Sequence, residues 1–289
     1  MDLYFNSLTD NDGNNAANWF QDSLYFATPH LAVPTSGDTA YIAVGTCTSF
    51  SFSCDAVHIN TGATLTTNSS AVGTNDGTIG TNASGGVVST NNGTIGDNAS
   101  GATVDNNAFS GTITANEGAI TANNGILTSN FGTVGSNSGT VESNLSGGIV
   151  TDNSGIVTNN GSGSTVATNF NGATVTDNYG TVTLNASWGT VTLNGSGGTT
   201  TTNSGTVTTN ASGGVVVTNA SGGVVSTNAS GGSVVSNAGT VTTNNGNVQL
   251  TGVITGGAGT LSAATTTNLA SHTAGTNVTL PSGGGLTWW

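Results

Sequence analysis

The chain contains neither lysine nor arginine among its 289 residues. Proteins neutralise phosphate groups with these two side chains, so their absence argues against nucleic-acid binding and against attachment to anionic membranes. The 13 acidic residues give a net charge of −13, and all of them lie between Asp2 and Asp177. The sequence beyond Asp177 is therefore nearly free of charge.

Cysteine and long apolar runs are also scarce. The two cysteines, Cys47 and Cys54, either form a disulfide that closes a small loop or remain small buried apolar side chains. No apolar run is long enough to span a bilayer, so we expect no membrane insertion. The opening segment MDLYFNSLTD lacks the positive and apolar regions of a secretory signal. We therefore expect a mature chain that has already been processed, export without a cleaved leader, or release by another route such as lysis.

Groups that carry catalysis are few and scattered. His30, His58 and His272 lie in different regions, and none has another His or a Cys at metal-ligand spacing. No loop of clustered acids suggests calcium, and no local motif marks a Ser-His-Asp arrangement. Asp152 and Asp177 would lie one coil apart if three repeats closed a coil, which leaves a glycosidase pair open as a hypothesis. We expect no enzyme, no cofactor and no metal.

The sequence does contain one short motif, which is repeated from residue 61 to residue 251. Each copy has Gly, a Thr or small residue, an aliphatic residue, two mostly small or polar residues, and Asn. DGTIGTN (76–82) is a seven-residue copy, and ASGGVVSTN (83–91) is a nine-residue copy. Only Thr200 interrupts the aliphatic place. β-Branched residues favour strands, and Gly and Asn tolerate the positive φ of sharp corners.

A repeat this short buries nothing alone, but stacked copies form a continuous apolar column. We therefore predict an all-β fold, a parallel β-solenoid (β-helix) built from 7- or 9-residue GTVxxN repeats. The predicted core includes Val88, Val134, Val182, Val191, Val216 and Val241. A predicted ladder of corner asparagines, bonded to the backbone of the next coil, includes Asn82, Asn91, Asn137, Asn185, Asn219 and Asn244. Two or three repeats can close a coil, and we expect three. Disorder is the alternative, against which the unbroken aliphatic column argues.

Two segments of different amino-acid composition flank the repeat array. Residues 1–60 hold nine of the sixteen aromatic residues and predict an N-terminal aromatic cap with strands that lead into the first coil. Residues 61–251 form the array, and residues 252–289 form a C-terminal cap or docking segment. This segment ends in Trp288 and Trp289, which either fold back over the last coil or mediate self-association with a neighbouring subunit.

Two passages near the start of the array carry a family resemblance. SGDTAYIA (36–43) and DAVHINTGATLTTN (55–68) resemble the opening of right-handed β-helices in phage tail appendages and bacterial surface adhesins. The resemblance covers residues 36–251, and it implies a non-enzymatic fibre or binding surface, although some such proteins are depolymerases. The chain lacks the calcium-binding nonapeptide, the acyltransferase hexapeptide and the Leu-rich pattern, so the functions of those solenoids are not carried over.

These observations predict a non-enzymatic structural fibre or surface-appendage protein, extracellular or on a virion surface. We expect a homo-oligomer or filament that associates or adheres through its ends and corners, with a surface glycan or receptor as partner. Ice binding through a Thr-rich face and a carbohydrate-binding, tailspike-like role are the alternatives. Aromatic residues at corners between repeats either contact a ligand or sister chain or merely cover the core. They are Phe109, Phe131, Phe170, Tyr179 and Trp188.

Overall fold

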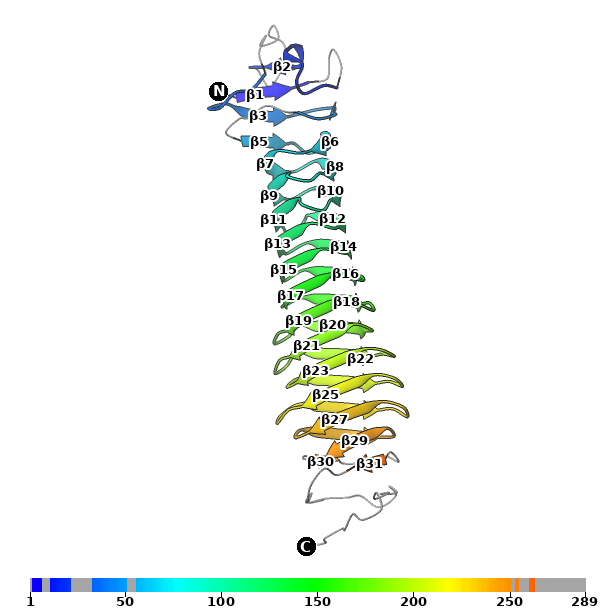
Figure 1. Cartoon of the computed structure of the whole chain (residues 1–289). Coiled ribbons are helices and arrows are strands. Elements are labelled where there is room, and N and C mark those ends of the chain that lie inside the picture. The colour runs from blue at the N-terminus through cyan, green and yellow to red at the C-terminus, as the bar shows by residue number, and fades with distance from the viewer. Residues whose placement is uncertain are drawn as a thin grey trace. The chain divides into compact units, whose positions relative to one another are not determined.

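The computed structural model describes residues 2–6, 11–21, 33–50, 56–250, 253–254 and 260–262. The chain divides into two compact units, residues 1–140 and 141–289. The predicted all-β parallel solenoid is confirmed, because successive short strands alternate between two parallel sheets in each unit (Figure 1). The one helix among the described residues is a single 3-10 turn, Ala16–Asn18.

In the first unit, the odd-numbered strands form one parallel sheet and all even-numbered strands but one form the other. The even sheet contains β4 (Thr46–Cys47), β6 (Thr64–Asn68), β8 (Thr78–Asn82), β10 (Thr94–Asn98), β12 (Thr112–Asn116) and β14 (Ile126–Asn130). The odd sheet contains β1 (Asp2–Phe5), β3 (Thr39–Ile42), β5 (Ala56–Ile59), β7 (Ala71–Asn75), β9 (Val87–Asn91), β11 (Thr103–Asn107), β13 (Ala119–Asn123) and β15 (Thr133–Asn137). The exception is β2 (Trp19–Phe20), which pairs antiparallel with β1.

The second unit repeats this arrangement, and β16 (Thr140–Asn144) lies at the boundary. The even sheet of the second unit contains β18 (Ile156–Asn160), β20 (Thr174–Asn178), β22 (Thr190–Asn194), β24 (Thr206–Asn210), β26 (Val224–Asn228), β28 (Thr240–Asn244) and β30 (Val253–Ile254). Its odd sheet contains β17 (Ile149–Asn153), β19 (Thr165–Asn169), β21 (Thr181–Asn185), β23 (Thr199–Asn203), β25 (Val215–Asn219), β27 (Ser233–Asn237), β29 (Asn247–Leu250) and β31 (Thr260–Ser262).

Two repeats close each coil, so the expectation of three repeats was wrong. Asparagines bonded between adjacent coils are 14, 16 or 18 residues apart, as for Asn116 with Asn130, Asn82 with Asn98, and Asn98 with Asn116. The reason is a bend inside each strand. From β6 to β28 every strand buries its second and fifth residues, whereas a regular strand alternates its faces. The alternation breaks at the third residue, where the strand bends. Two bent strands and two corner turns complete one coil.

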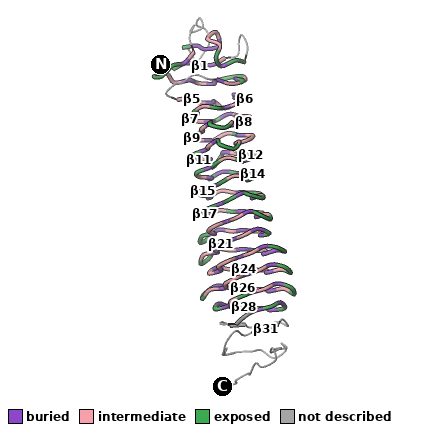
Figure 2. Tube along the Cα trace, viewed as in Figure 1, coloured by how far each residue is buried: buried purple, intermediate pink, exposed green. Residues whose placement is uncertain are grey.

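The core of each sheet is a single column of aliphatic side chains, one from the second place of each strand. Figure 2 shows these buried positions recurring in coil after coil. The valines named from the sequence are fully buried: Val88, Val134, Val182, Val191, Val216 and Val241. Thr200 lies in the same column between Val182 and Val216, and its buried hydroxyl has no hydrogen-bond partner.

The corner asparagines form ladders of side-chain amides, in addition to the backbone contacts expected from the sequence. In β21, Asn185 Nδ2 donates to Asn203 Oδ1 at 2.8 Å. It also donates to the carbonyl oxygens of Gly189 and Thr206, each at 3.1 Å, while its Oδ1 accepts from Asn169 Nδ2 at 2.9 Å. Amide-to-amide bonds also reach the other asparagines named from the sequence, which are Asn82, Asn91, Asn137, Asn219 and Asn244.

Apolar and aromatic side chains replace the ladder in the first coils. Ile59 takes the register position of Asn75, so the amide ladder of the odd sheet starts at Asn75, whose Oδ1 has no donor. Trp19 is fully buried, and its indole N–H donates to the Gly13 carbonyl oxygen at 2.8 Å. Its ring packs edge-on against Phe5, with the ring centroids 5.4 Å apart. These contacts give the first unit a cap that is packed like an ordinary core.

Candidate ligand-binding recess

The corners of the coils have two lengths, which follow directly from the repeat length. A seven-residue repeat leaves two residues between strands, as at 204–205, and a nine-residue repeat leaves four, as at 186–189 and 220–223. The third residue of a four-residue turn has a positive φ in all described turns of the array except 108–111, for example 81° at Gly197 and 85° at Gly222. Each four-residue turn therefore extends further from the strands than a two-residue turn does.

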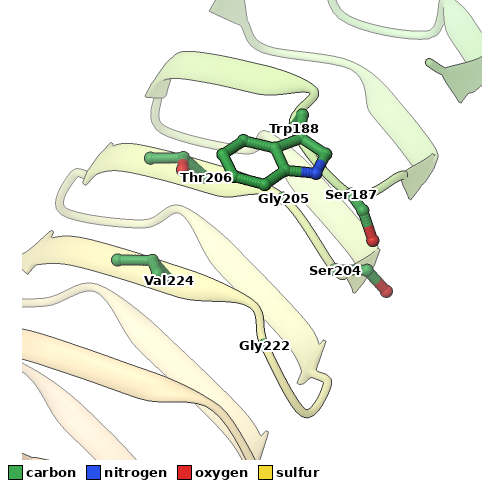
Figure 3. Close-up of a pocket in the computed structure, with 7 residues that line it drawn as sticks. All are labelled: Ser187, Trp188, Ser204, Gly205, Thr206, Gly222 and Val224. Atoms are coloured by element: carbon green, nitrogen blue, oxygen red, sulfur yellow. The ribbon is translucent and has the colours of Figure 1, made fainter. Parts of the chain in front are cut away.

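In the second unit a two-residue turn between two four-residue turns leaves an open recess. The short turn, 204–205, joins β23 to β24, and the turns of the adjacent coils at this corner are 186–189 and 220–223. The recess has a volume of about 430 Å³, within the range of small-molecule sites. It is lined by Ser187, Trp188, Ser204, Gly205, Thr206, Gly222 and Val224 (Figure 3).

Trp188 occupies a backbone position that glycine takes in the adjacent turns. Its φ is 66°, in the left-handed region, which costs a residue with a side chain roughly 1–2 kcal/mol. The side chain is 79% exposed, so little burial offsets this cost. The Trp188 carbonyl oxygen accepts a hydrogen bond from Gly172 N at 3.2 Å, which ties its turn to that of the preceding coil. An exposed aromatic residue on a strained turn is a candidate for function.

The floor of the recess is held close to the coil before it. A Cβ placed on Gly205 would lie only 2.2 Å from the Gly189 carbonyl oxygen, so glycine allows the two turns to approach. In Figure 3 the indole of Trp188 extends over the start of β24 at Thr206, and the side chains of Ser187 and Ser204 point to the same side. The site thus combines one aromatic face with three hydroxyl groups.

The opposite corner of the second unit has an equivalent arrangement, but there the space is filled. Tyr179 begins a two-residue turn that lies between the four-residue turns 161–164 and 195–198. Its ring covers Gly195, because a Cβ on that glycine would lie 2.4 Å from Tyr179 Cε1. Ser204 holds the corresponding place in the open recess. The difference between a tyrosine and a serine therefore separates a filled corner from an open one.

No ionisable side chain lines the recess. Within the described residues there is no group of three or more His, Cys, Asp or Glu side chains arranged to hold a metal ion. The arrangement around Trp188 is therefore suited to recognising a neutral molecule through stacking and hydroxyl contacts.

The carboxylate pair considered from the sequence is not brought together. Asp152 lies on β17 in the odd sheet, where it pairs with Thr168. Asp177 lies on β20 in the even sheet, where it pairs with Leu193. The hypothesis of a glycosidase pair was wrong, because it depended on three repeats per coil.

Two of the predicted sites lie partly or wholly outside the described residues. Cys47 is buried and free, its Sγ lies 3.6 Å from the Ser49 carbonyl oxygen, and burial raises the pKa of its thiol to about 12. Cys54 lies outside the described residues, so their disulfide remains a prediction. Trp288 and Trp289 also lie outside them, and self-association through this pair likewise remains a prediction.

A second aromatic surface lies on the odd sheet of the first unit. The rings of Tyr4 and Tyr41 stack at a centroid distance of 4.9 Å, and those of Tyr41 and His58 at 5.1 Å. Desolvation, with smaller contributions from the charges of Asp2 and Tyr4, raises the pKa of the Tyr41 phenol. Because these rings cover one another face to face, they offer less free aromatic surface than Trp188 does.

The corner aromatics divide into two groups by exposure. Phe131, Phe170 and Tyr179 are 46%, 41% and 39% exposed, which fits the interpretation that they cover the core. Phe109 and Trp188 are 91% and 79% exposed, so they cover little. Trp188 was predicted to lie at a corner, but the recess was not predicted, although the order of turn lengths and the Trp in a Gly position were its signals in the sequence.

Comparison with known proteins finds no relative of this chain. No family model, no curated protein and no solved structure matches it. The solenoid part of the predicted resemblance is confirmed by the fold, and the assignment to phage appendages or adhesins remains a prediction. No helix among the described residues has the length and apolarity needed to cross a membrane.

Proposed function

We propose that this chain is a non-enzymatic structural protein of an extracellular fibre or surface appendage, which includes a virion appendage. The observation that carries the proposal is the continuous register within each unit. From coil to coil, the same strand positions pair and Asn bonds to Asn, as in the sequence β20, β22 and β24. A solenoid grows by strand-edge pairing, so an end without a cap offers another chain the same edge that each inner coil uses for pairing.

The surface chemistry supports a structural role more than a catalytic one. The side chains that face solvent are mainly Thr, Ser and small residues, and the hypothesised carboxylate pair lies on two different sheets. Stability along the stack comes from repetition, so a long surface is built without a large apolar core. Such a scaffold suits the display or spacing of attached groups outside a cell.

Association of the purified chain tests this proposal. We expect sedimentation velocity to detect concentration-dependent self-association and negative-stain electron microscopy to show particles joined at their ends. Replacing both terminal tryptophans, Trp288→Ala with Trp289→Ala, should weaken the association because buried aromatics dominate such contacts. Phe109→Ser is the matched control, because it removes an exposed aromatic from a corner. Monomers alone at every concentration would contradict the proposal.

Ice binding is a second candidate, favoured by one column of hydroxyl side chains. The third residues of the even strands in the second unit, from β18 to β28, face solvent. They are Thr158, Thr176, Thr192, Thr208, Ser226 and Thr242. Adjacent strands of a sheet lie about 4.8 Å apart, so this column spaces its hydroxyls regularly. The equivalent column of the odd sheet is interrupted by Ala167, Val217 and Val235.

A thermal hysteresis measurement decides this second candidate. A freezing gap in the unmodified protein that is lost in Thr192→Lys with Thr208→Lys would support ice binding by the even sheet. Thr183→Lys on the odd sheet is the matched control and should leave the gap unchanged. A solution that freezes at its melting point would remove the candidate and leave the structural proposal as it stands.

A further inference from the structure

We propose that the recess beside Trp188 binds one pyranose ring of an uncharged surface glycan. The inference rests on the proposed function, because it names the partner that a surface appendage would contact. The site consists of the indole of Trp188, the hydroxyls of Ser187, Ser204 and Thr206, and the glycine floor at Gly205.

The aromatic face is the first argument for a sugar. A pyranose presents C–H groups on one face, and these pack favourably against the electron-rich face of an aromatic ring. Trp188 is 79% exposed, and its carbonyl oxygen is hydrogen-bonded to Gly172 N, so the turn is braced while the ring remains accessible. The backbone that carries the indole is therefore held, and the ring is open for stacking.

The hydroxyl groups are the second argument. Each Ser or Thr hydroxyl can both donate and accept, as each sugar hydroxyl can. None of the hydroxyls of Ser187, Ser204 and Thr206 takes part in a hydrogen bond within the described chain. They are free to bond the equatorial hydroxyls at the rim of a stacked ring.

The lack of charged side chains in the recess selects against other ligands that stack on tryptophan. Nucleotides and phosphorylated or sulfated sugars need cations, and the chain has no Lys or Arg. A cationic ligand gains most when a carboxylate or several aromatic rings surround it, but the lining holds one ring and no carboxylate. An acidic sugar would likewise find no cation in the lining to pair with. An uncharged ring is the ligand that remains.

The open corner itself is the third argument. At the equivalent corner Tyr179 fills the space over Gly195. At this corner the short turn carries Ser204 instead, and the facing turn carries a tryptophan in a strained conformation with φ of 66°. A short turn with a small first residue leaves the space open, and a tryptophan in place of glycine on the facing turn adds an exposed ring to it.

An array of immobilised neutral and acidic oligosaccharides, probed with the full chain, tests the site. We expect binding to neutral members only, and isothermal titration with soluble neutral hits should show affinity reduced roughly tenfold to a hundredfold in Trp188→Gly, as for loss of a stacking aromatic. Ser204→Tyr should reduce it similarly, because Tyr would fill the recess as Tyr179 fills its own. Phe109→Ser should leave affinity unchanged.

Each outcome has a defined meaning. Trp188→Gly restores the residue found in the adjacent turns, so lost binding in this variant with unaltered circular dichroism reports on the recess and not on folding. No binding to any neutral glycan, or binding that survives both Trp188→Gly and Ser204→Tyr, would overturn the inference. Self-association by sedimentation is measured on the same samples, so failure of the glycan site is distinguished from failure of the structural role.

Discussion

At the scale of single residues, asparagine at the fifth place of each strand supports the stack. A buried amide has two donor hydrogens and one acceptor oxygen that need partners. The ladder provides them, since Asn185 donates to Asn203 and accepts from Asn169 in the coils on either side. A polar residue such as Asn185 thus fills the corner of an inner coil without an unsatisfied group. This is why small side chains suffice where an ordinary domain needs a large apolar core.

Breaking the ladder at one rung should be costly. In Asn185→Ala, the Asn169 amide loses an acceptor and Asn203 Oδ1 loses its donor, both in buried positions. We expect the free energy of unfolding to fall by about 2–4 kcal/mol, as for two unsatisfied buried groups. Chemical denaturation measures the change. Thr183→Ala, on the exposed side of the same strand, is the control and should change it by less than about 0.5 kcal/mol.

The single interruption of the aliphatic column predicts a stabilising substitution. The buried hydroxyl of Thr200 has no hydrogen-bond partner, and valines lie on both sides of it in the column. Thr200→Val should raise the free energy of unfolding by about 1–2 kcal/mol, because it removes an unsatisfied polar group at nearly constant volume. The reciprocal change Val207→Thr should lower it by a similar amount. A destabilised Thr200→Val protein would contradict the description of this column.

Cys47 predicts a loss of stability at alkaline pH. Burial raises the pKa of its thiol from 9.0 to about 12, so the folded state favours the neutral thiol. The contribution is fully present below pH 9 and is lost as the pH rises from 9 towards 12. We expect the unfolding free energy of the unmodified chain to fall more steeply over this range than that of Cys47→Val. Equal slopes in denaturation series at several pH values would show that the thiol does not contribute.

At the scale of elements, the length of each corner turn decides what the surface looks like. A two-residue turn lies close to the strands, a four-residue turn protrudes, and adjacent four-residue turns bond to each other, as Gly197 N does to the Gly213 carbonyl oxygen at 3.0 Å. The order of 7- and 9-residue repeats therefore determines where ridges and recesses lie along each corner. The recess at Ser204 arises from this order, and the filled corner at Tyr179 from the same order with a larger side chain.

The turn at Trp188 predicts that the substitution proposed to abolish glycan binding will increase stability. Trp188→Gly relieves a left-handed conformation while giving up little burial, because the side chain is 79% exposed. We expect the free energy of unfolding to rise by roughly 1 kcal/mol. Gly197→Ala is the opposite control at the same place of another turn, where φ is 81°, and it should be destabilised. Thermal denaturation of both variants measures the pair.

Much of the fold was predictable from the sequence because the signal lies within one repeat. The aliphatic place and Asn, three residues apart, identify the buried column and the corner, and they are where the structure has them, as at Val182 and Asn185. The number of repeats per coil was not predictable, since every repeat is nearly the same and none marks where a coil closes. The recess is formed by turns that are 16 or more residues apart in the sequence. Trp188 could therefore be identified from the sequence, but the other residues that line the recess could not.

At the scale of the whole molecule, stability follows from repetition, and so does the structural role that we propose. Each unit is stabilised chiefly by contacts between consecutive coils, so its stability is close to a sum of equal local terms. A chain without Lys or Arg and with its acids confined to Asp2–Asp177 adds few specific surface contacts to this sum. The described surface is uniform except where turns and aromatic residues depart from the repeat, and we propose that partners bind at those departures.

Hydrogen exchange of the backbone amides, resolved along the chain by mass spectrometry, tests the central claim most directly. The account predicts slow exchange for the strands of every coil from β6 to β28, with faster exchange at the four-residue turns between them. Exchange at the rate of an unstructured chain anywhere within those strands would contradict it, because a stack whose coils depend on their neighbours cannot lose an inner coil and remain folded.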